Sequence, residues 1–426
     1  MTLSKSRSRF PGAYPRSIRS AGGARVLDED ALLYVDWNGA LGAVSLGWGD
    51  AAVDAAVHAQ VSRGPLFSLP SVAVEERAAR PLADLVLCAE AVRFFKTGSE
   101  ATEAAVRVAR AATGRDVVLS CGYHGWHSMW AAVRPEHPGV PESMTPLIWE
   151  FPYNDALTAE MLCDRIVRAY GAGPAAIILE PTNVELPAEG FLEGVRALAT
   201  EVGAVLIFDE MFTGFRWHRG GYQALCGVTP DLATFGKAMG NGYAVAALVG
   251  QRDLMRWSRL ASGTFGGDLI GIVAATAVMG RYARDDVPVH MAALGRRLID
   301  DYQAIAADVG ENMTWVEGQP PHPVIRWGEV DSPVPGRDVG RHIGIVKEPN
   351  RHRASLFFQE VVRRGHLVHP EGINFSAAHT SEDVASLLAA CREAAAIVAG
   401  AVRKGDVRAR IEGDPIDPTP AWRTVT

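Results

Sequence analysis

The centre of the chain alternates short apolar segments with longer amphipathic ones, and this alternation limits the fold more than any other feature. Each apolar segment is bounded by glycine, proline or a charged residue, as is typical of a buried strand. Strands that alternate with helices form a mostly parallel sheet covered by helices on both faces, so we predict an α/β fold. The predicted strands are residues 91–95, 117–120, 175–180, 204–209 and 244–250, and the predicted helices are residues 100–112, 159–170, 191–202 and 269–284.

The two ends of the chain differ from this centre. Residues 26–37 are predicted to form a β-hairpin, whereas residues 320–350, rich in proline, glycine, histidine and arginine, are expected to be irregular. Residues 355–364 and 381–402 have helical periodicity. The polar tail after Lys404 is expected to run over the surface.

These differences predict two domains. We expect a large α/β domain over residues 57–284 and a smaller α+β domain assembled from residues 1–56 and 285–426. The first twenty residues are basic, and no apolar stretch follows them. We therefore expect an extended arm there and not a secretion signal.

Composition excludes several function classes. The chain of 426 residues is 48 % apolar and 21 % charged, which is ordinary for a folded globular protein, and its net charge of −7 argues against a general nucleic-acid binder. It has no apolar run long enough to cross a membrane. The five cysteines contain no CxxC pair, which indicates a reducing compartment. We therefore expect a cytoplasmic protein without nucleic-acid or membrane partners, and the spacing of histidine and cysteine predicts no metal site.

A glycine-serine pair stands at the start of one predicted helix. The sequence Lys-Thr-Gly-Ser-Glu, from Lys96 to Glu100, joins the first predicted strand to that helix. Ser99 is predicted to be its N-cap, and Gly98 and Ser99 can offer backbone N–H groups and a hydroxyl to a phosphate. The alternative is an ordinary capped helix without a ligand.

Two further residues lie at or after the ends of predicted strands, and a third follows a short apolar segment. Tyr123 lies in a glycine-flanked loop where its ring can approach a flat ligand, although the loop can equally pack on its own core. Asp209 ends an apolar strand, where a buried carboxylate needs a cationic ligand, a salt bridge or a helix N-terminus as its partner. Lys237 lies in an apolar, glycine-rich stretch, which favours the lowered pKa of a Schiff-base amine, although a lone lysine can also extend to solvent.

Together these features suit pyridoxal phosphate as a cofactor. The carboxyl ends of parallel strands meet at one edge of a sheet, so these residues are expected to lie close together. A lysine can form an aldimine with the cofactor, and a carboxylate can hold the pyridine nitrogen protonated. A helix N-terminus can bind the phosphate, while an aromatic ring stacks on the pyridine.

The motifs that surround these residues resemble those of a known family. In chain order they are Thr-Gly-Ser-Glu-Ala, Tyr-His-Gly, Glu-Pro, Phe-Asp-Glu-Met-Phe-Thr-Gly-Phe-Arg and Phe-Gly-Lys. The chain thereby resembles class III (ω-type) aminotransferases, and most nearly the branch that is similar to glutamate-1-semialdehyde 2,1-aminomutase. The resemblance runs from Tyr14 to Thr380. It implies the PLP-dependent transferase fold type I, with a mostly parallel central sheet sandwiched by helices, and pyridoxal 5'-phosphate as the cofactor.

The resemblance also implies roles for individual residues around the cofactor ring. Lys237 would form the internal aldimine, and Asp209 would pair with the pyridine nitrogen. Tyr123 would stack on one face of the ring and Met211 would pack on the other. Lys237 and Asp209 are thus the predicted catalytic residues.

Other implied roles concern the phosphate, the partner subunit and the substrate. Gly98 and Ser99 would bind the phosphate. Thr264 matches a threonine that reaches the phosphate of the partner subunit, which implies a homodimer with shared active sites. The candidate substrate-binding residues are Glu180, Asn183 and Ser68.

The implied reaction moves an amino group between an amino acid such as glutamate and a small keto or aldehyde biosynthetic substrate, with sugars among the candidates. Glutamate-1-semialdehyde 2,1-aminomutase and a PLP epimerase or decarboxylase on the same scaffold remain as alternatives. A non-catalytic regulator is disfavoured because Lys237 and Asp209 are both present. Three pocket-shaping loops, residues 37–40, 240–244 and 266–268, depart from the semialdehyde enzymes, and the second resembles relatives that aminate sugars or other keto compounds.

Overall fold

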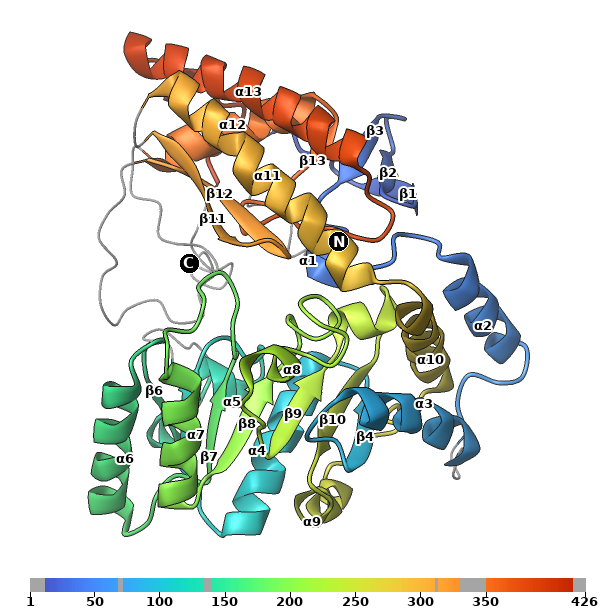
Figure 1. Ribbon diagram of the computed structural model, residues 1–426, viewed down its shortest axis with the longest axis vertical. Helices are drawn as coiled ribbons and strands as arrows, with labels where there is room; N and C mark the ends of the chain where they lie inside the picture. Colours follow the sequence, from blue (N-terminus) through green and yellow to red (C-terminus); the bar gives the residue numbers. More distant parts are fainter. Residues whose placement is uncertain (1–11, 68–71, 134–138, 311–312, 329–349, 417–426) are drawn as a thin grey trace. The chain divides into compact units, whose positions relative to one another are not determined.

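The computed structural model describes residues 12–67, 72–133, 139–310, 313–328 and 350–416. Within these residues the chain forms two compact units (Figure 1). The first, here called the sheet unit, comprises the described residues of 50–288. The second, here called the terminal unit, comprises the described residues before 50 and after 288.

The sheet unit is built on a seven-stranded sheet with the order β4-β10-β9-β8-β7-β5-β6. Neighbouring strands from β9 to β6 are parallel, whereas β10 is antiparallel to both β9 and β4. The predicted mostly parallel sheet is therefore confirmed, and the carboxyl ends of its parallel strands share one edge. The strands are β4 (Ala91–Phe95), β5 (Val118–Cys121), β6 (Ile148–Glu150), β7 (Ala176–Leu179), β8 (Val205–Asp209), β9 (Leu232–Phe235) and β10 (Ala246–Gly250).

Helices flank this sheet and bury its central strands along their whole length. Every residue of β5, β7, β8, β9 and β10 is buried, which explains their nearly continuous apolar sequences. Helix α4 packs across β7 to β10, while α6 contacts β5, and α7 contacts β7 and β8. The helices are α2 (Ala51–Val61), α3 (Val72–Leu85), α4 (Gly98–Thr113), α5 (Ser128–Ala131), α6 (Ala156–Tyr170), α7 (Phe191–Val202), α8 (Gln223–Cys226), α9 (Arg252–Met255) and α10 (Leu269–Arg284).

The start of α4 corrects one prediction. The N-cap is Thr97 and not Ser99, because the Thr97 hydroxyl accepts a hydrogen bond from the N–H of Glu100 while the Glu100 carboxylate accepts one from the N–H of Thr97. This capping box begins the helix at Gly98 and leaves Ser99 in its first turn. Gly114 ends the helix in the left-handed conformation.

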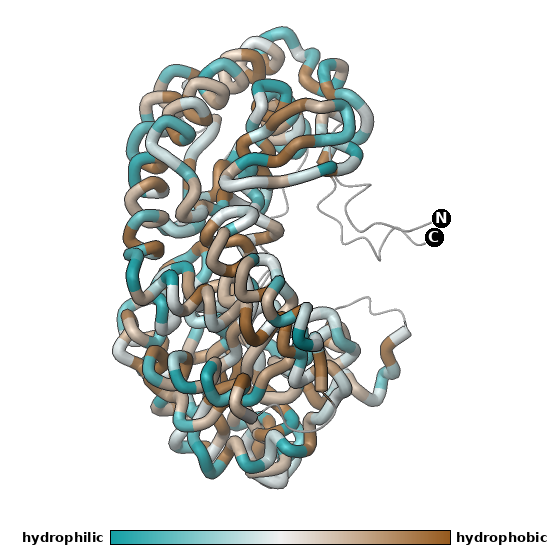
Figure 2. The backbone as a smooth tube through the Cα atoms, turned by 90° about the vertical axis from the view of Figure 1, so that its right-hand side faces the viewer, coloured by the Kyte–Doolittle hydropathy of each residue, from teal (hydrophilic) through white to brown (hydrophobic). Residues whose placement is uncertain are grey.

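The terminal unit holds a four-stranded sheet, β1-β2-β3-β13, and a two-stranded sheet, β11-β12. The predicted hairpin is β2 and β3, and β13 is added to β3 in parallel. Hydrophilic and hydrophobic residues alternate along many helices in Figure 2, as expected for amphipathic helices. The elements are β1 (Ile18–Gly22), β2 (Arg25–Asp28), β3 (Leu33–Asp36), α1 (Gly39–Gly42), α11 (Val287–Val309), β11 (Thr314–Gln319), β12 (His322–Trp327), α12 (Asn350–Arg363), β13 (His366–Leu367) and α13 (Ser381–Lys404).

Three expectations for the chain ends need correction. Strand β1 lies where an extended arm was expected, and because all five of its residues are exposed it has no alternating apolar signal. Strand β12 lies in a segment predicted to be irregular, of which residues 329–349 fall outside the described part. The tail after Lys404 is not wholly superficial, because Ile411 and Ile416 are buried.

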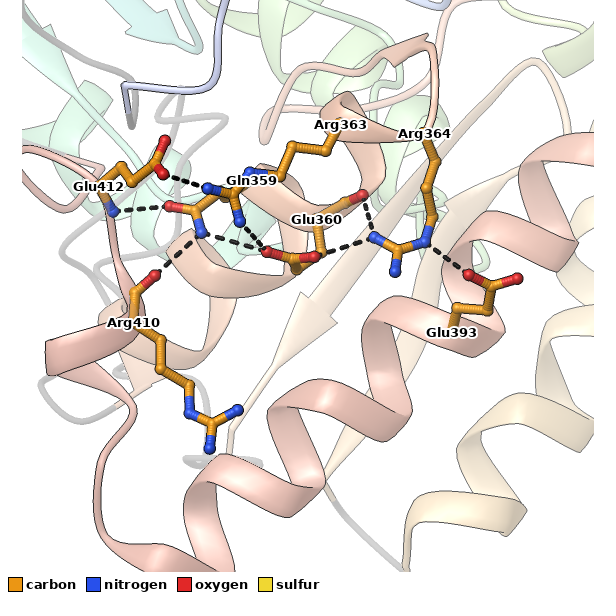
Figure 3. Close-up of polar contacts among 7 residues, drawn as sticks. All are labelled: Gln359, Glu360, Arg363, Arg364, Glu393, Arg410 and Glu412. Atoms are coloured by element: carbon orange, nitrogen blue, oxygen red, sulfur yellow. Dashed lines mark hydrogen bonds and ion pairs between the residues drawn. The ribbon is translucent and has the colours of Figure 1, made fainter.

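Polar contacts hold this tail against α12 (Figure 3). The Gln359 side chain donates to the carbonyl of Arg410 at 3.0 Å and accepts from the N–H of Glu412 at 2.7 Å. The buried amide of Gln359 thus supplies the backbone hydrogen bonds that a neighbouring strand would otherwise give the tail. The other members of the cluster are Glu360, Arg363, Arg364 and Glu393.

Among the described residues, α13 is the one helix that is long and apolar enough to span a membrane, and 56 % of its most apolar stretch is buried inside the protein. The core helix of a globular unit has the same composition.

Candidate active site

Asp209 lies at the carboxyl end of β8, the central strand of the sheet, and its side chain is 3 % exposed. Its Oδ1 accepts hydrogen bonds from the N–H of Met211 at 3.0 Å and from the hydroxyl of Thr234 at 3.2 Å. Its Oδ2 lies 2.8 Å from Nδ1 of His124. A carboxylate offers about four lone-pair sites, so the three contacts leave room for one more donor.

His124 is the partner that the sequence left open for Asp209. The imidazole is buried and lies edge-on to the ring of Trp130, with the ring centroids 5.0 Å apart. The carbonyl of His124 accepts a hydrogen bond from the Thr102 hydroxyl of α4 at 2.6 Å, which fixes the backbone as well. The prediction did not single out His124, although it directly follows Tyr123 and its type is suited to pair with a buried carboxylate.

Glu210 is a second buried carboxylate beside Asp209, but local structure engages it. It accepts hydrogen bonds from the hydroxyl of Thr213, from the N–H of Tyr222 at 2.7 Å and from the N–H of Gln223 at 3.0 Å. Burial raises the pKa of Glu210. All three donors to Glu210 come from the segment directly after β8, so Glu210 holds that turn, whereas two of the three contacts of Asp209 come from other elements of the sheet unit.

Lys237 follows β9, the strand next to β8. Its φ angle of +44° is in the left-handed region, which lysine seldom adopts, and backbone strain of this kind is concentrated at functional sites. Lys237 is exposed, and its Nζ lies 4.6 Å from the centroid of the Phe212 ring. Because Phe212 comes three residues after Asp209, the amine lies at the same edge of the sheet as the carboxylate.

Gly98 and Ser99 occupy the first turn of α4, whose leading N–H groups have no acceptor within the helix. The hydroxyl oxygen of Ser99 accepts a hydrogen bond from the N–H of Trp126 at 3.3 Å, which joins the start of α4 to the loop after β5. Helix α4 has 16 residues, and the positive end of its dipole lies at this turn. The turn is therefore suited to bind an anionic group such as a phosphate.

Met211 connects these two parts of the edge. A β-carbon on Gly98 would come within 2.9 Å of the Met211 sulfur, and a β-carbon on Gly236 within 2.7 Å of it. The thioether therefore occupies space that two glycines leave open, one at the start of α4 and one directly before Lys237. This packing brings the ends of β8 and β9 and the start of α4 together.

Tyr123 follows β5 and Glu180 follows β7, the neighbouring strand. The N–H of Tyr123 donates to Oε1 of Glu180 at 2.9 Å, and Nδ2 of Asn183 donates to Oε2 of Glu180 at 2.8 Å. The tyrosine side chain is exposed, whereas Glu180 is 9 % exposed. The structure thus brings together three residues that the sequence had assigned separately to the cofactor and the substrate.

Two predicted site residues are not among the residues in these contacts. Thr264 is exposed, in the segment that leads to α10. Ser68 lies outside the described residues.

The fold and this edge define the class of protein. The fold is the fold type I of PLP-dependent transferases, as predicted. The profile of the family described as Aminotransferase class-III matches residues 10–319, and the chain belongs to this family. The prediction of an aminotransferase is therefore confirmed.

Two curated relatives match most of the chain. The 3-aminobutyryl-CoA aminotransferase of Cloacimonas acidaminovorans is 34 % identical over 399 residues, which cover 91 % of this chain and 91 % of the relative. The glutamate-1-semialdehyde 2,1-aminomutase of Syntrophobacter fumaroxidans is 36 % identical over 323 residues, which cover 71 % of this chain and 73 % of the relative. The predicted resemblance to the aminomutase branch is confirmed.

Solved structures agree with the fold. The FumI protein of a Sphingopyxis species, in its PLP internal aldimine form, superposes with a TM-score of 0.83 and 27 % identity over 95 % of this chain and 94 % of that one. An omega-transaminase from Sphaerobacter thermophilus superposes with a TM-score of 0.81 and 24 % identity over 92 % of this chain and 93 % of that one. Pyridoxal phosphate is the cofactor of this family, and the helix N-terminus and the buried carboxylate described above fit its phosphate and its pyridine nitrogen.

Proposed function

We propose that the protein transfers an amino group between an amino acid such as glutamate and a small keto or aldehyde biosynthetic substrate, for which a keto sugar is a candidate. One observation carries the proposal. The Asp209 carboxylate is 3 % exposed, is held by three donors and has one lone-pair site left, at the strand end beside Lys237. A protonated pyridine nitrogen would supply the remaining donor.

When bound, pyridoxal phosphate supplies an aldehyde carbon that takes up an amino group and a ring that holds electrons released at the substrate carbon. In the proposal the negative charge of the Asp209 carboxylate would stabilise the protonated form of the ring nitrogen. The first turn of α4, with Gly98 and Ser99, holds the phosphate through N–H groups and a hydroxyl. Tyr123 covers one face of the ring and Met211 packs on the other.

Lys237 is the proposed base. Its Nζ would hold the aldehyde carbon until an amino donor displaces it, and would then move a proton between the substrate carbon and the cofactor carbon. The left-handed backbone at Lys237 and the ring of Phe212 support this role, since both fix the position from which the amine acts.

The proposal includes a homodimer with shared active sites. Thr264 is exposed and therefore available to a second copy of the chain. Mixing K237A and T264A subunits tests this assignment, because a shared site would restore one intact active site in the mixed dimer. Activity no greater than that of either variant alone would contradict it.

The second candidate is an aminomutase that isomerises glutamate 1-semialdehyde. The relative from Syntrophobacter fumaroxidans, at 36 % identity, favours it. The two candidates differ in their products, because a transaminase with glutamate as donor releases 2-oxoglutarate, whereas an aminomutase returns the amino group to the same carbon skeleton.

The test is an absorbance titration of the PLP-loaded protein with L-glutamate. We expect the visible cofactor band to be lost as 2-oxoglutarate is released. K237A should abolish this conversion, while K404A, which changes an exposed lysine at the end of α13, should leave it unchanged. Conversion in K237A at the wild-type rate would overturn the proposal. Isomerisation of the semialdehyde without 2-oxoglutarate release would favour the aminomutase.

A further inference from the structure

Hydrogen bonds join three loops at the carboxyl edge of the sheet, so that one loop contacts each of the other two. They follow β7, β5 and β6, which are adjacent strands. The loop after β5 carries Tyr123, the loop after β7 carries Glu180 and Asn183, and the loop after β6 carries Tyr153 and Asn154. Side chains of Glu180, Tyr153 and Asn154 make the hydrogen bonds that join one loop to the next.

Glu180 is the central link. Its two carboxylate oxygens have different partners. Oε1 accepts from the N–H of Tyr123 in the loop after β5 at 2.9 Å, and Oε2 accepts from Asn183 in its own loop at 2.8 Å. Hydrogen bonds to a carboxylate are stronger than those to a neutral acceptor, and Glu180 is 9 % exposed, so little water competes for them. The carboxylate therefore fixes the peptide that carries the tyrosine ring.

The backbone beside Tyr123 is shaped for this contact. Gly122 has a φ of +116°, which side chains of other residues rarely permit. A β-carbon there would come within 2.9 Å of Oε1 of Glu180. Only a glycine at this position lets the carboxylate approach the N–H of the next residue.

The loop that carries Glu180 is itself clamped from the far side. Asn154 has a φ of +64°, and its Nδ2 donates to Oε1 of Glu185 at 2.8 Å and to the carbonyl of Leu186 at 3.0 Å. Its Oδ1 accepts from the N–H of Ala188 at 2.7 Å. The Tyr153 hydroxyl donates to the carbonyl of Pro181 at 2.7 Å, directly after Glu180.

We infer that Glu180 is a positioning residue for the Tyr123 ring, and that Asn183 and the Asn154 clamp hold Glu180 for that task. This inference rests on the proposed function, in which the Tyr123 ring covers the cofactor. It gives Glu180 and Asn183 a role different from the substrate contacts that the sequence predicts for them. A ring fixed through its own peptide meets the cofactor in one orientation, whereas a loosened loop would sample several.

The experiment exchanges the charge between positions 180 and 183. N183D places two carboxylates together and should loosen the loop. The double variant E180Q/N183D restores one acceptor and one donor between the two side chains, and the amide oxygen introduced at position 180 can still accept from the N–H of Tyr123.

Two readouts are taken on each variant. The first is hydrogen exchange of the peptide that contains Tyr123, measured without cofactor. The second is the circular dichroism of the bound cofactor together with its dissociation constant. We expect N183D to speed exchange, reduce the cofactor dichroism and weaken PLP binding about tenfold, which corresponds to about 1.4 kcal/mol. The double variant should return within about twofold of wild type.

N154G tests the contribution of the Asn154 clamp, which contacts the loop of Glu180 away from Tyr123. Glycine tolerates the positive φ, so this variant removes the clamp without straining the backbone. We expect about threefold weaker PLP binding, with an unchanged far-ultraviolet spectrum.

The outcomes separate the two proposals. Normal cofactor dichroism and affinity in N183D, or no recovery in E180Q/N183D, would overturn the positioning role. The second result would mean that the charge itself is needed at position 180, as a substrate or cofactor contact requires. Failure of the wild-type protein to take up PLP would overturn the proposed function and this inference together.

Discussion

Each unit of the protein contains buried histidine, and the two units differ in the partners of the imidazole. In the sheet unit, His124 faces the carboxylate of Asp209 at 2.8 Å. In the terminal unit, His379 stacks on the ring of Trp37 and His366 accepts a hydrogen bond from its indole N–H. The ring nitrogens of both histidines have neutral partners only. The same residue type therefore supports a charged group in one unit and neutral packing in the other.

The hydrogen bonds of the terminal cluster fix its protonation state. Nδ1 of His366 accepts from the indole N–H of Trp37 at 3.1 Å, and Nδ1 of His379 accepts from the N–H of Ser376 at 3.0 Å. Both Nδ1 atoms must be unprotonated, because a proton there would face a second donor. Nε2 of His379 donates to the carbonyl of Asp36 at 3.0 Å, which completes a neutral ring.

The largest effect is expected from removal of the charged partner in the sheet unit. D209N keeps the shape of the side chain but removes the charge, and we expect the rate of the glutamate half-reaction to fall about 10³-fold. Stopped-flow absorbance of the cofactor band measures it. D231N is the matched control, because Asp231 pairs with Arg196 at the opposite end of the neighbouring strand. A loss in D209N no greater than in D231N would contradict the role of Asp209.

The terminal cluster predicts the next largest effect, on stability and not on chemistry. Burial lowers the pKa of His366 and of His379 from 6.5 to about 4. Between these pH values the unfolded chain binds more protons than the folded one, so the stability is complete above pH 6.5 and is lost as the pH falls towards 4. We expect a loss on the order of 3 kcal/mol between pH 7 and about pH 5 in urea unfolding.

The matched variant for this prediction is H366N/H379N. It should be less stable at pH 7 but have a much flatter pH profile, because the groups that titrate are gone. Asp383, near both histidines, has a lowered pKa despite its desolvation, since Arg25 and the N–H of Thr380 hydrogen-bond to it. It therefore titrates below this window. An equally steep profile in the double variant would show that other groups cause the loss.

The comparison also shows which features can be predicted from sequence. Residues 191–202 and 269–284 were predicted with the bounds that the structure has, because amphipathic periodicity sets the burial of a helix. Strands β1 and β12 were missed because neither has an alternating apolar pattern of its own, and each is defined by its partner strand. The Thr97 cap was missed because two nearby residues, both good caps, compete at one helix start.

The site divides in the same way. Asp209 and Lys237 could be chosen from sequence because each follows an apolar strand, and the topology places such residues at one edge. The pairing of His124 with Asp209 and the use of Glu180 by Tyr123 could not be chosen. Both contacts join loops from different strands, so they depend on side-chain directions that no local pattern contains.

A smaller effect is expected from the histidine of the sheet unit. H124N can place its amide nitrogen near the position of Nδ1 and still donate to Asp209, whereas H124F keeps a ring beside Trp130 but donates nothing. We expect H124F to slow the half-reaction about 10- to 100-fold, the range for a lost hydrogen bond to a charged group, and H124N to slow it only a few fold. Equal rates in the two variants would mean that the hydrogen bond does not matter.

The smallest effect is expected from W37F, which keeps an aromatic ring against His379 but removes the donor to Nδ1 of His366. We expect a loss of about 1 kcal/mol at pH 7 in urea unfolding. The pH profile should also flatten, because Nδ1 of His366 can then take up a proton without facing a second donor. W48F is the control, since the indole of Trp48 donates to the Asp36 carboxylate at 2.8 Å and to neither histidine. Its profile between pH 7 and about pH 5 should keep the wild-type slope, and the same flattening in W48F would assign the pH dependence to the packing of the unit and not to the neutral imidazoles.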